Sequence, residues 1–346
     1  MTTRLLPTDE PDTFKSAVAE AARLLNAGEV VALPTETVYG LAANALNATA
    51  VAKIFEAKER PTFDPLIVHL PHRKDLKDVA EVPEDIAAAI DALTHKFWPG
   101  PLTIILPKKP AVPDLVTAGL STVAVRVSAD PVFMRVCRTV DKPLAAPSAN
   151  RFGSISPTSA LAVKAELDGR IPLILDSGAS SHGVESTIIK VEPGSPKPFI
   201  SILRPGPITP DDLKPFGTVK HAFKKKDKDD TAIEAPGTMA SHYAPRTPLR
   251  LLSKPEDFTP EPGKRYALLS YRGEPDDGYL ELADWAGIHI LSPGKGKIIE
   301  CATRLFYAMR ELDKLGADEI IAEPVSEQGV GMAVMDRLRR ASAKRG

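Results

Sequence analysis

The chain has 346 residues, 44 of them Lys or Arg and 45 Asp or Glu, which gives a formal net charge of −1. This near-neutral balance excludes a protein whose whole surface attracts a polyanion such as nucleic acid or an acidic membrane. Cys137 and Cys301 are the only cysteines, which excludes a disulfide framework and a cysteine-rich zinc site and predicts a reducing compartment.

The N-terminal stretch MTTRLLPTDEPD has no apolar core of the kind that a signal peptide needs, and no apolar run approaches the length of a membrane span. We therefore expect a soluble, cytoplasmic protein. Its length allows two domains that each bury a core of their own.

The first predicted elements surround a group of polar residues. An amphipathic helix is predicted at residues 14–27, then a buried strand at residues 30–33, a helix opened by Asn47 as N-cap, and an apolar strand at residues 66–70. Two strands around one helix favour a phosphate-binding site at their loops. The polar residues at these loops are Thr35, Glu36, Thr37 and Tyr39 after the first strand, Lys58 and Arg60 after the helix, and His69 on the second strand.

Lys58 and Arg60 are separated by one residue and followed by Pro61, which cannot continue a helix. Because the chain leaves the helix there, the two cations can converge on one anion, lysine as a point charge and arginine as a planar fork for phosphate oxygens. The alternative is that both are solvated cations that complement the dipole at a helix C-terminus.

Arg126 is the next charged residue in an apolar setting. A helix at residues 86–97 ends at Trp98-Pro99-Gly100-Pro101, a corner that we interpret as structural, and an apolar strand follows at residues 102–106. The alternating strand at residues 121–127 carries Arg126. Arginine is seldom buried without an anionic partner, so we expect either a cross-strand salt bridge or a ligand carboxylate.

Short elements continue to about residue 206. Asp130 is the predicted N-cap of a short helix, and residues 144–146, 172–176 and 188–191 are predicted strands, with Arg204 at the end of a further one. Many short strands with few long helices predict an α+β or mixed α/β fold, a twisted sheet with helices packed on it.

A loop dense in hydroxyl and amide groups, residues 147–158, precedes a helix that starts near Ser159. Such a loop offers neutral donors and main-chain amides to an anion at a helix N-terminus. Turn formation alone also accounts for its Ser and Asn residues.

The composition changes at about residue 216. We predict a first domain at residues 1–215, a linker at residues 216–247 that contains the charge run 224–230, and a smaller α/β domain at residues 248–346. Within the linker, residues 235–245 are too rich in Met, His and Tyr for a solvated spacer. The basic C-terminal helix that ends in RLRRASAKR is either an RNA contact or a solvated face.

The common nucleotide and hydrolase motifs, GxxxxGK[ST], GxGxxG, HExxH and GxSxG, do not occur. Other motifs occur in a fixed order: PTETVYGL, Lys58-x-Arg60 followed by PLIVH, FWPGPLT, VAVRV, Ser148-x-Asn150, GVESTI and LRPG. Together they resemble the YrdC family of threonylcarbamoyl-AMP synthases. SHYAP and GMAVMDRLRRASA are similar to the long, two-domain form of that family.

This resemblance implies a twisted mixed sheet around a large cationic cleft, with a smaller C-terminal Rossmann-like domain. It implies a nucleotidyltransferase that condenses L-threonine, bicarbonate and ATP to threonylcarbamoyl-AMP and pyrophosphate, with Mg²⁺ as cofactor. The product would pass to a separate transferase that modifies a tRNA adenosine next to the anticodon, so contact with tRNA itself is expected to be weak or indirect.

The resemblance also implies a set of ligand residues. The residues expected to hold threonine are Thr37, His69, Arg126 and Ser186, with the main chain near Ala146. The residues expected at the ATP site are Lys58, Arg60, Asp64, Thr122, Ser148, Asn150, Ser156, Arg204 and Tyr243, with Lys58 and Arg60 serving catalysis. Two positions depart from the family's pattern: Asp64, where asparagine is common, and Lys190, where aspartate is usual.

Two alternatives to this function are an RNA-binding, translation-associated module without catalysis and carbamoyl-adenylate chemistry on another acceptor. We further predict that residues 235–245 fold back as a lid over the nucleotide cleft, with Tyr243 touching ATP. The alternative is an interdomain linker whose Met and Tyr pack the domain interface.

Overall fold

The computed structural model describes residues 2–222, 235–239 and 242–343. Its internal contacts divide the chain into two compact units. The first comprises Met1–Phe152, Pro157–Ser181 and Glu185–Thr238, and the second comprises Gly153–Ser156, His182–Val184 and Met239–Gly346. The boundary expected after residue 215 falls inside the first unit, and the charge run 224–230 lies outside the described residues.

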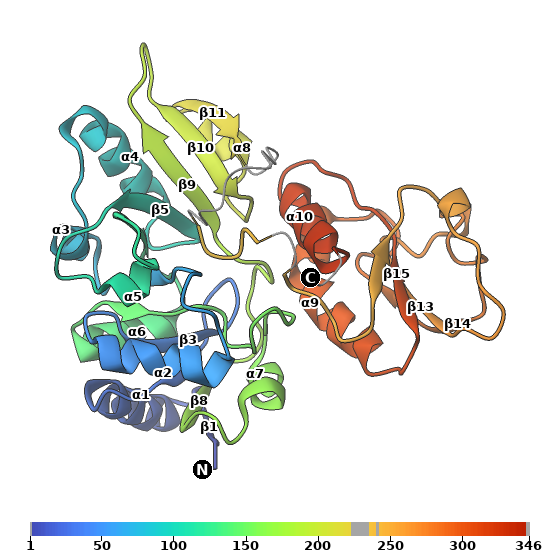
Figure 1. Ribbon diagram of the computed structural model, residues 1–346, viewed down its shortest axis with the longest axis horizontal. Helices are drawn as coiled ribbons and strands as arrows, with labels where there is room; N and C mark the ends of the chain where they lie inside the picture. The colour runs from blue at the N-terminus through green and yellow to red at the C-terminus, as the bar shows by residue number, and fades with distance from the viewer. Residues whose placement is uncertain (1, 223–234, 240–241, 344–346) are drawn as a thin grey trace. The chain divides into compact units, whose positions relative to one another are not determined.

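The first unit is built on a long mixed sheet (Figure 1). Its strands are β1 (Arg4–Pro7), β2 (Val31–Leu33), β3 (Gly40–Asn44), β4 (Ile67–His69), β5 (Leu102–Pro107), β6 (Thr122–Arg126), β7 (Leu144–Ala145), β8 (Leu173–Asp176), β9 (Thr187–Glu192), β10 (Phe199–Arg204) and β11 (Thr218–His221). They lie in the order β1-β8-β2-β3-β7-β4-β6-β5-β9-β10-β11. Parallel and antiparallel pairs alternate irregularly, which confirms the predicted mixed fold class.

Several helices of this unit begin at a residue whose side chain caps them. The helices are α1 (Pro11–Asn26), α2 (Ala48–Lys58), α3 (Leu76–Val79), α4 (Ala87–Phe97), α5 (Asp114–Thr117), α6 (Pro131–Val140), α7 (Ala160–Leu167) and α8 (Pro210–Leu213), with 3-10 turns η1 (Arg73–Asp75) and η2 (Glu84–Ile86). The side chains of Asn47, Asp130 and Ser159 accept hydrogen bonds from the first free amides of α2, α6 and α7, as predicted for Asn47 and Asp130. Each such cap stabilises its helix by about 1 kcal/mol.

Strand β2 has a hydrophobic core on each side, and its successive side chains point alternately into the two cores. Val31 and Leu33 of β2 pack with α1 and α6, whereas Ala32 packs in the larger core that includes residues of α2, α4 and α7. Figure 1 shows α1 and α6 as neighbours at the N-terminal end of this unit. The buried Cys137 of α6 is a free thiol within this packing, as expected.

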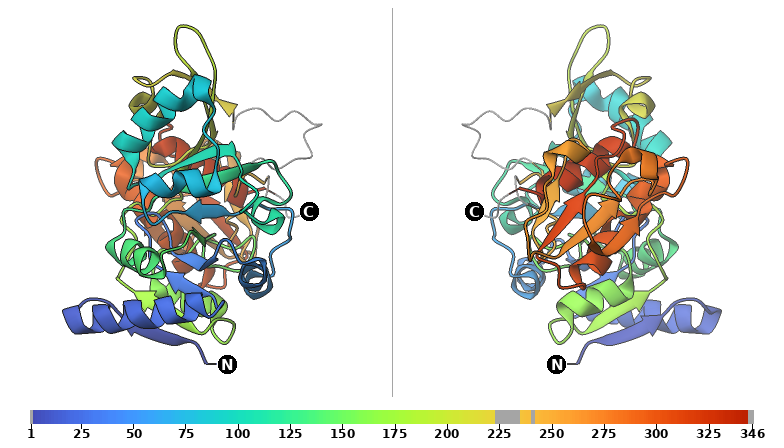
Figure 2. Two further views of the ribbon diagram at one scale, coloured as in Figure 1. Left: turned by 90° about the vertical axis from the view of Figure 1, so that its left-hand side faces the viewer. Right: turned by 90° about the vertical axis from the view of Figure 1, so that its right-hand side faces the viewer.

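The second unit is a smaller α/β domain, which confirms the predicted C-terminal fold. Its strands β12 (Leu249–Leu251), β13 (Tyr266–Ser270), β14 (Trp285–Ile290) and β15 (Glu319–Ala322) form a parallel sheet in the order β12-β15-β13-β14, seen side by side in the right-hand view of Figure 2. Its helices are α9 (Ile298–Asp313) and α10 (Gly331–Ala341), with 3-10 turns η4 (Pro255–Asp257) and η5 (Pro275–Asp277).

The C-terminal helix is not simply a solvated face. The Arg337 side chain is fully buried and forms a 2.9 Å ion pair with Asp336, which also pairs with Arg340 at 3.0 Å. Residues 344–346, the end of the predicted basic stretch, lie outside the described residues. Among the helices that the structure describes, none combines the length and apolar character that a membrane span requires.

Candidate active site

Two of the residues that we expect to bind the substrate threonine lie at the ends of neighbouring strands. Strands β4 and β6 are parallel, and their register sets His69 beside Arg126. The PTET loop follows β2. Arg126 Nη1 donates a 3.0 Å hydrogen bond to Thr37 Oγ1 of this loop, so the fold brings Thr37, His69 and Arg126 together.

Arg126 has a partner that the expected ligand set omitted. Its Nη2 lies 2.6 Å from Glu36 Oε1, and its Nε donates to the carbonyl of Gly100 at 3.2 Å. The Ser128 hydroxyl donates to Glu36 Oε2 at 2.5 Å. Burial raises the pKa of Glu36, but the charge of Arg126 and the Ser128 hydroxyl outweigh burial and lower that pKa to about 2. Arg126 therefore forms a salt bridge as expected, but with Glu36 of the PTET loop rather than with a residue on a neighbouring strand.

Ser186, expected to bind threonine, contacts Arg204, which is expected at the ATP site. Its Oγ is 2.8 Å from Thr103 Oγ1, and Arg204 Nη2 donates to the Ser186 hydroxyl at 3.1 Å and to its carbonyl at 3.0 Å. The Trp98 corner connects this part to Arg126, because the Thr187 amide donates to the Pro101 carbonyl at 3.0 Å and Arg126 donates to the neighbouring Gly100. The corner is structural, and it positions site residues.

Lys58 and Arg60 are both buried, so the interpretation as solvated helix-end cations is wrong. Glu59, at a φ of 54°, ends α2 in the left-handed region and turns the chain between them. Lys58 Nζ donates to the carbonyls of Ser148 and Asn150. Burial, together with the nearby charge of Arg60, holds the pKa of Lys58 well below its usual range.

Arg60 is fixed by its own loop. Its Nη2 lies 2.9 Å from Asp64 Oδ2 and donates to the Pro65 carbonyl at 2.9 Å. Burial raises the pKa of Asp64 in spite of the opposing charge of Arg60. Asp64 thus serves as the counter-ion of Arg60.

Residues 235–238, which we call the strap, are bound to this cluster by their main chain. Arg204 Nη1 donates to the Pro236 carbonyl at 3.0 Å, and the Gly237 amide lies close enough to the Asp64 carboxylate to lower its pKa. The Ala235 side chain is buried in an apolar cluster with Ile67, Ile105, Ala124 and Ile188. The strap belongs to the first unit and contacts two residues expected at the ATP site.

The other expected ATP residues are placed differently. Asn150 is buried and donates from Nδ2 to the Arg151 carbonyl at 2.7 Å, and the half-exposed Thr122 begins β6. Ser156 and Tyr243 belong to the second unit. Tyr243 is buried there, stacked on Phe306 with 5.7 Å between ring centroids. The expectation that Tyr243 touches ATP stays a prediction, and Ser241 lies outside the described residues.

The main-chain position expected near threonine is also ordered by the sheet. The Ala146 amide donates to the Ile67 carbonyl at 3.0 Å, directly after β7. Gly40, at the start of β3, approaches this residue closely: a Cβ there would lie 3.3 Å from the Ala146 Cβ. A side chain larger than hydrogen at residue 40 would therefore press on this main chain.

His69 gives the site a pH signature. Burial and the charge of Arg126 lower its pKa from 6.5 to about 3. Below pH 6.5 the unfolded chain binds a proton at this histidine and the folded chain does not, so stability falls as the pH drops toward 3.

We therefore expect His69→Asn to reduce the acid sensitivity of the first unit. Between pH 6.5 and 5.0 the wild-type protein should lose about 1.5 kcal/mol more of its unfolding free energy than the variant. Urea unfolding at both pH values measures this difference. Glu36 titrates in both proteins and cancels in the comparison, and an identical pH dependence of the two would contradict a neutral, buried His69.

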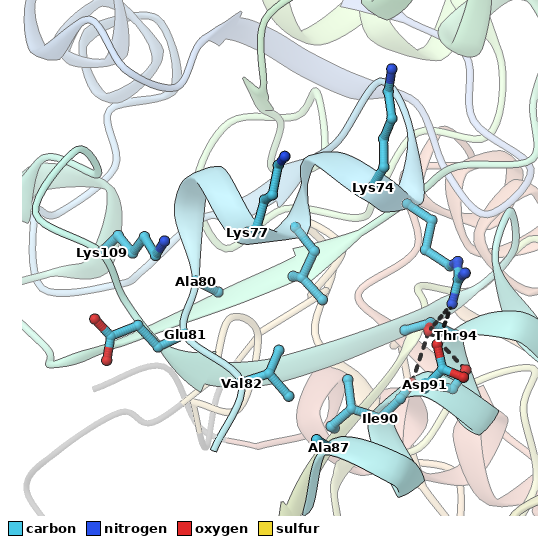
Figure 3. Close-up of a pocket in the computed structure, with 12 residues that line it drawn as sticks. Lys74, Lys77, Ala80, Glu81, Val82, Ala87, Ile90, Asp91, Thr94 and Lys109 are labelled. Atoms are coloured by element: carbon cyan, nitrogen blue, oxygen red, sulfur yellow. Dashed lines mark hydrogen bonds and ion pairs between the residues drawn. The ribbon is translucent and has the colours of Figure 1, made fainter. Parts of the chain in front are cut away.

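A groove of about 570 Å³ lies elsewhere on the first unit, between the η1–α3 segment and α4. Figure 3 shows Lys74 and Lys77 extending from one wall, with Val82 and Ile90 among the apolar lining. Arg73 at its rim forms a 2.8 Å ion pair with Asp91. None of the expected ligand residues lines this groove.

Comparison with known proteins shows the family of the chain. Residues 23–206 match the profile of the Sua5/YciO/YrdC family, described as "Telomere recombination", and residues 208–343 match the profile "Threonylcarbamoyl-AMP synthase, C-terminal domain". The threonylcarbamoyl-AMP synthase of Pyrococcus abyssi is 39% identical, over 94% of each sequence. That of Bacillus subtilis is 40% identical, over 98% of the chain and 96% of the relative.

The chain belongs to the threonylcarbamoyl-AMP synthase family.

As a member of the threonylcarbamoyl-AMP synthase family in its two-domain form, the protein is an enzyme of the nucleotidyltransferase class, which confirms the predicted resemblance. The alternative of a module without catalysis is wrong. A crystal structure of P. abyssi Sua5 complexed with L-threonine is 36% identical, with a TM-score of 0.83 over 98% of each chain. A P. abyssi Sua5 variant with a histidine and a tyrosine replaced by alanine gives a TM-score of 0.84 at 35% identity, over 98% of this chain and 96% of that one.

Proposed function

We propose that this enzyme condenses L-threonine, bicarbonate and ATP to threonylcarbamoyl-AMP and pyrophosphate. The observation that carries the proposal is the contact of the buried Arg126 with the Thr37 hydroxyl. A guanidinium is suited to the threonine carboxylate, and hydroxyl groups from Thr37 and Ser186 are suited to the threonine hydroxyl. The family's threonine-bound relative supports the same substrate.

The chemistry needs positioning more than a covalent residue. A neutral threonine amine donates its electron pair to the bicarbonate carbon, and loss of water leaves a carbamate. A carbamate oxygen then attacks the α-phosphorus of ATP, and the bond to pyrophosphate breaks. Negative charge grows on the phosphate oxygens during this step, so cations fixed in a buried site lower its barrier.

Lys58 and Arg60 are the cations that we assign to this step. Both side chains are held by carbonyl groups, so little reorganisation is needed when phosphate arrives. Burial lowers the pKa of Lys58 in the ligand-free chain, and the phosphate charge would oppose that effect. Binding of ATP would therefore favour the charged ammonium where charge stabilisation is required.

Magnesium is expected to accompany the nucleotide, but these residues do not fit a metal held by the protein. The carboxylate among the expected ATP residues, Asp64, already forms an ion pair with Arg60. Among the described residues no group of three or more His, Cys, Asp or Glu could hold a metal. A magnesium ion bound mainly by phosphate oxygens and water needs no such cage.

The proposed product is labile and requires a consumer. We assign it to threonylcarbamoyladenosine modification of tRNA next to the anticodon, through a separate transferase in the cytoplasm. The near-neutral charge of the chain supports weak or indirect contact with tRNA itself.

The test is release of pyrophosphate from ATP by the purified protein. Release that requires both threonine and bicarbonate supports the proposal. Release that depends on bicarbonate and a different amine would favour carbamoyl-adenylate chemistry on another acceptor, and no release under any combination would contradict the proposal.

Selectivity for threonine should depend on its hydroxyl group more than on its methyl group. A polar site left unpaired discriminates more strongly than an unfilled methyl pocket. We therefore expect serine, which lacks only the methyl, to be a better substrate than 2-aminobutyrate, which lacks the hydroxyl. Pyrophosphate release compared at equal concentrations of the two measures this, and faster use of 2-aminobutyrate would show that Thr37 and Ser186 do not recognise the hydroxyl.

A further inference from the structure

Arg126 and Glu36 form a buried ion pair whose groups are 2.6 Å apart, and only 3% and 9% of the two side chains are exposed. Burying two charges is unfavourable unless their remaining bonds are also made. A pair in this position therefore needs an explanation beyond stability. Its place beside Thr37, in the proposed threonine site, supplies one.

Both members of the pair are fixed by several contacts. Arg126 donates to the Gly100 carbonyl and the Thr37 hydroxyl and forms an ion pair with Glu36, and Glu36 accepts a hydrogen bond from the Ser128 hydroxyl. These contacts come from separate segments of the chain, so neither charged group is free to turn away. The site presents one positive and one negative group at a fixed separation, and its net charge is zero.

An α-amino acid has the matching charge pattern. At neutral pH it carries a carboxylate and an ammonium on the same carbon, with no net charge. A lone arginine would bind any small carboxylate, whereas an arginine paired with a carboxylate selects a ligand that also carries a cation.

We propose that Glu36 and Arg126 together bind the zwitterionic end of the substrate, Arg126 the carboxylate and Glu36 the ammonium. The inference rests on the proposed use of an amino acid and assigns to Glu36 a role in specificity. The carboxylate stays ionised at neutral pH because its pKa is lowered to about 2, so Glu36 accepts a hydrogen bond from the ammonium of the bound substrate. The ammonium then loses its proton to solvent before the neutral amine reacts with bicarbonate.

The competing explanation is that Glu36 only holds Arg126 in place. The two explanations differ in one measurable quantity, the ratio of affinities for threonine and for 3-hydroxybutyrate, which is threonine without its amine. A positioning role affects both ligands through the shared carboxylate. A contact with the ammonium affects only threonine.

Isothermal titration calorimetry of the full chain measures this ratio. We expect the wild-type protein to bind threonine at least about tenfold more tightly than 3-hydroxybutyrate, as for one charge-assisted contact. In Glu36→Gln the ratio of the two affinities should fall at least about fivefold, because the charge-assisted contact with the ammonium is lost. Glu29→Gln makes the same change in an exposed ion pair with Lys53 and should leave the ratio unchanged.

A ratio in folded Glu36→Gln equal to that of the wild type would overturn the proposal. If this variant does not fold, Glu36→Asp keeps the charge but withdraws it by one methylene, and it should lose more affinity for threonine than for 3-hydroxybutyrate. Equal losses would again overturn the proposal.

Failure of the proposed function is recognised separately. If the wild-type enzyme releases pyrophosphate with another amino acid, the threonine assignment fails, and the same ratio is measured with that amino acid and its deaminated analogue. If the wild-type protein binds no α-amino acid, the zwitterion site itself is disproved.

Discussion

Replacing Arg60 or Lys58 with alanine should lower the rate of threonine-dependent pyrophosphate release at least about tenfold. Each change removes charge-assisted contacts to phosphate worth roughly 1.5–3 kcal/mol, before any additional share in the transition state. Both side chains are buried and fixed by main-chain carbonyls, so a solvated cation from the surface is poorly placed to replace them. A steady-state assay with ATP, threonine and bicarbonate measures the rate.

Folding has to be controlled in this experiment. Arg60→Ala leaves the buried Asp64 without its ion pair, a loss of about 3–5 kcal/mol for a buried pair. Arg60→Lys retains the charge but not the fork, and should give an intermediate rate. Arg73→Ala removes an arginine from an exposed ion pair and should keep the wild-type rate. Wild-type activity in a folded Arg60→Ala protein would disprove the assignment of the cation cluster.

Cutting the chain after Ala222 should leave a folded first unit whose adenylate formation is reduced at least about a hundredfold, the size of effect that small misplacement of site groups produces. This fragment loses the strap and with it the contacts of Pro236 with Arg204 and of Gly237 with Asp64. It also loses Tyr243, which we predict to touch ATP. The fragment also lacks the groups that we predict to exclude water from the site, so the reactive carbamate would be exposed to hydrolysis.

The position of the cut follows from the structure. A cut further upstream, after residue 209, would remove α8 with its buried Leu213 and the edge strand β11, which pairs with β10 over four residues. Circular dichroism and urea unfolding test whether the 1–222 fragment is folded. In the full chain, Tyr243→Phe keeps the ring that stacks on Phe306 and should retain more activity than Tyr243→Ala. A folded 1–222 fragment as active as the full chain would disprove both the lid and a catalytic role for the strap.

Much of the local structure could be predicted because its causes are local. Asn47, Asp130 and Ser159 cap their helices through amides two or three residues away, so a short window of sequence contains the whole interaction. The strands predicted at residues 102–106 and 172–176 agree with β5 and β8 to within one residue, since short apolar runs favour buried strands. The motifs likewise placed Lys58 and Arg60 at the end of α2.

What the sequence did not predict depends on distant partners. Residues 40–44, GLAAN, have weak strand propensity, and β3 forms because β2 and β7 pair with its two edges. Glu36 was recognised as a loop residue, but its partner Arg126 is ninety positions along the chain and is brought there by the order of β2, β3, β7, β4 and β6. The only available signal was that a glutamate between apolar strands needs a cation.

The strap places a main-chain carbonyl on Arg204, where it would compete with a bound nucleotide for the guanidinium. In the ligand-free chain this guanidinium already has an internal ligand, the Pro236 carbonyl. If Arg204 binds ATP, as the family resemblance implies, the nucleotide binds only the fraction of molecules in which that carbonyl has withdrawn. A fraction of about one in ten weakens the apparent affinity about tenfold. The internal ligand is a main-chain group, so substitutions along residues 235–238 would change that fraction through the backbone conformation. The range of ATP concentration over which the enzyme works would then change without any change in a residue that contacts the nucleotide.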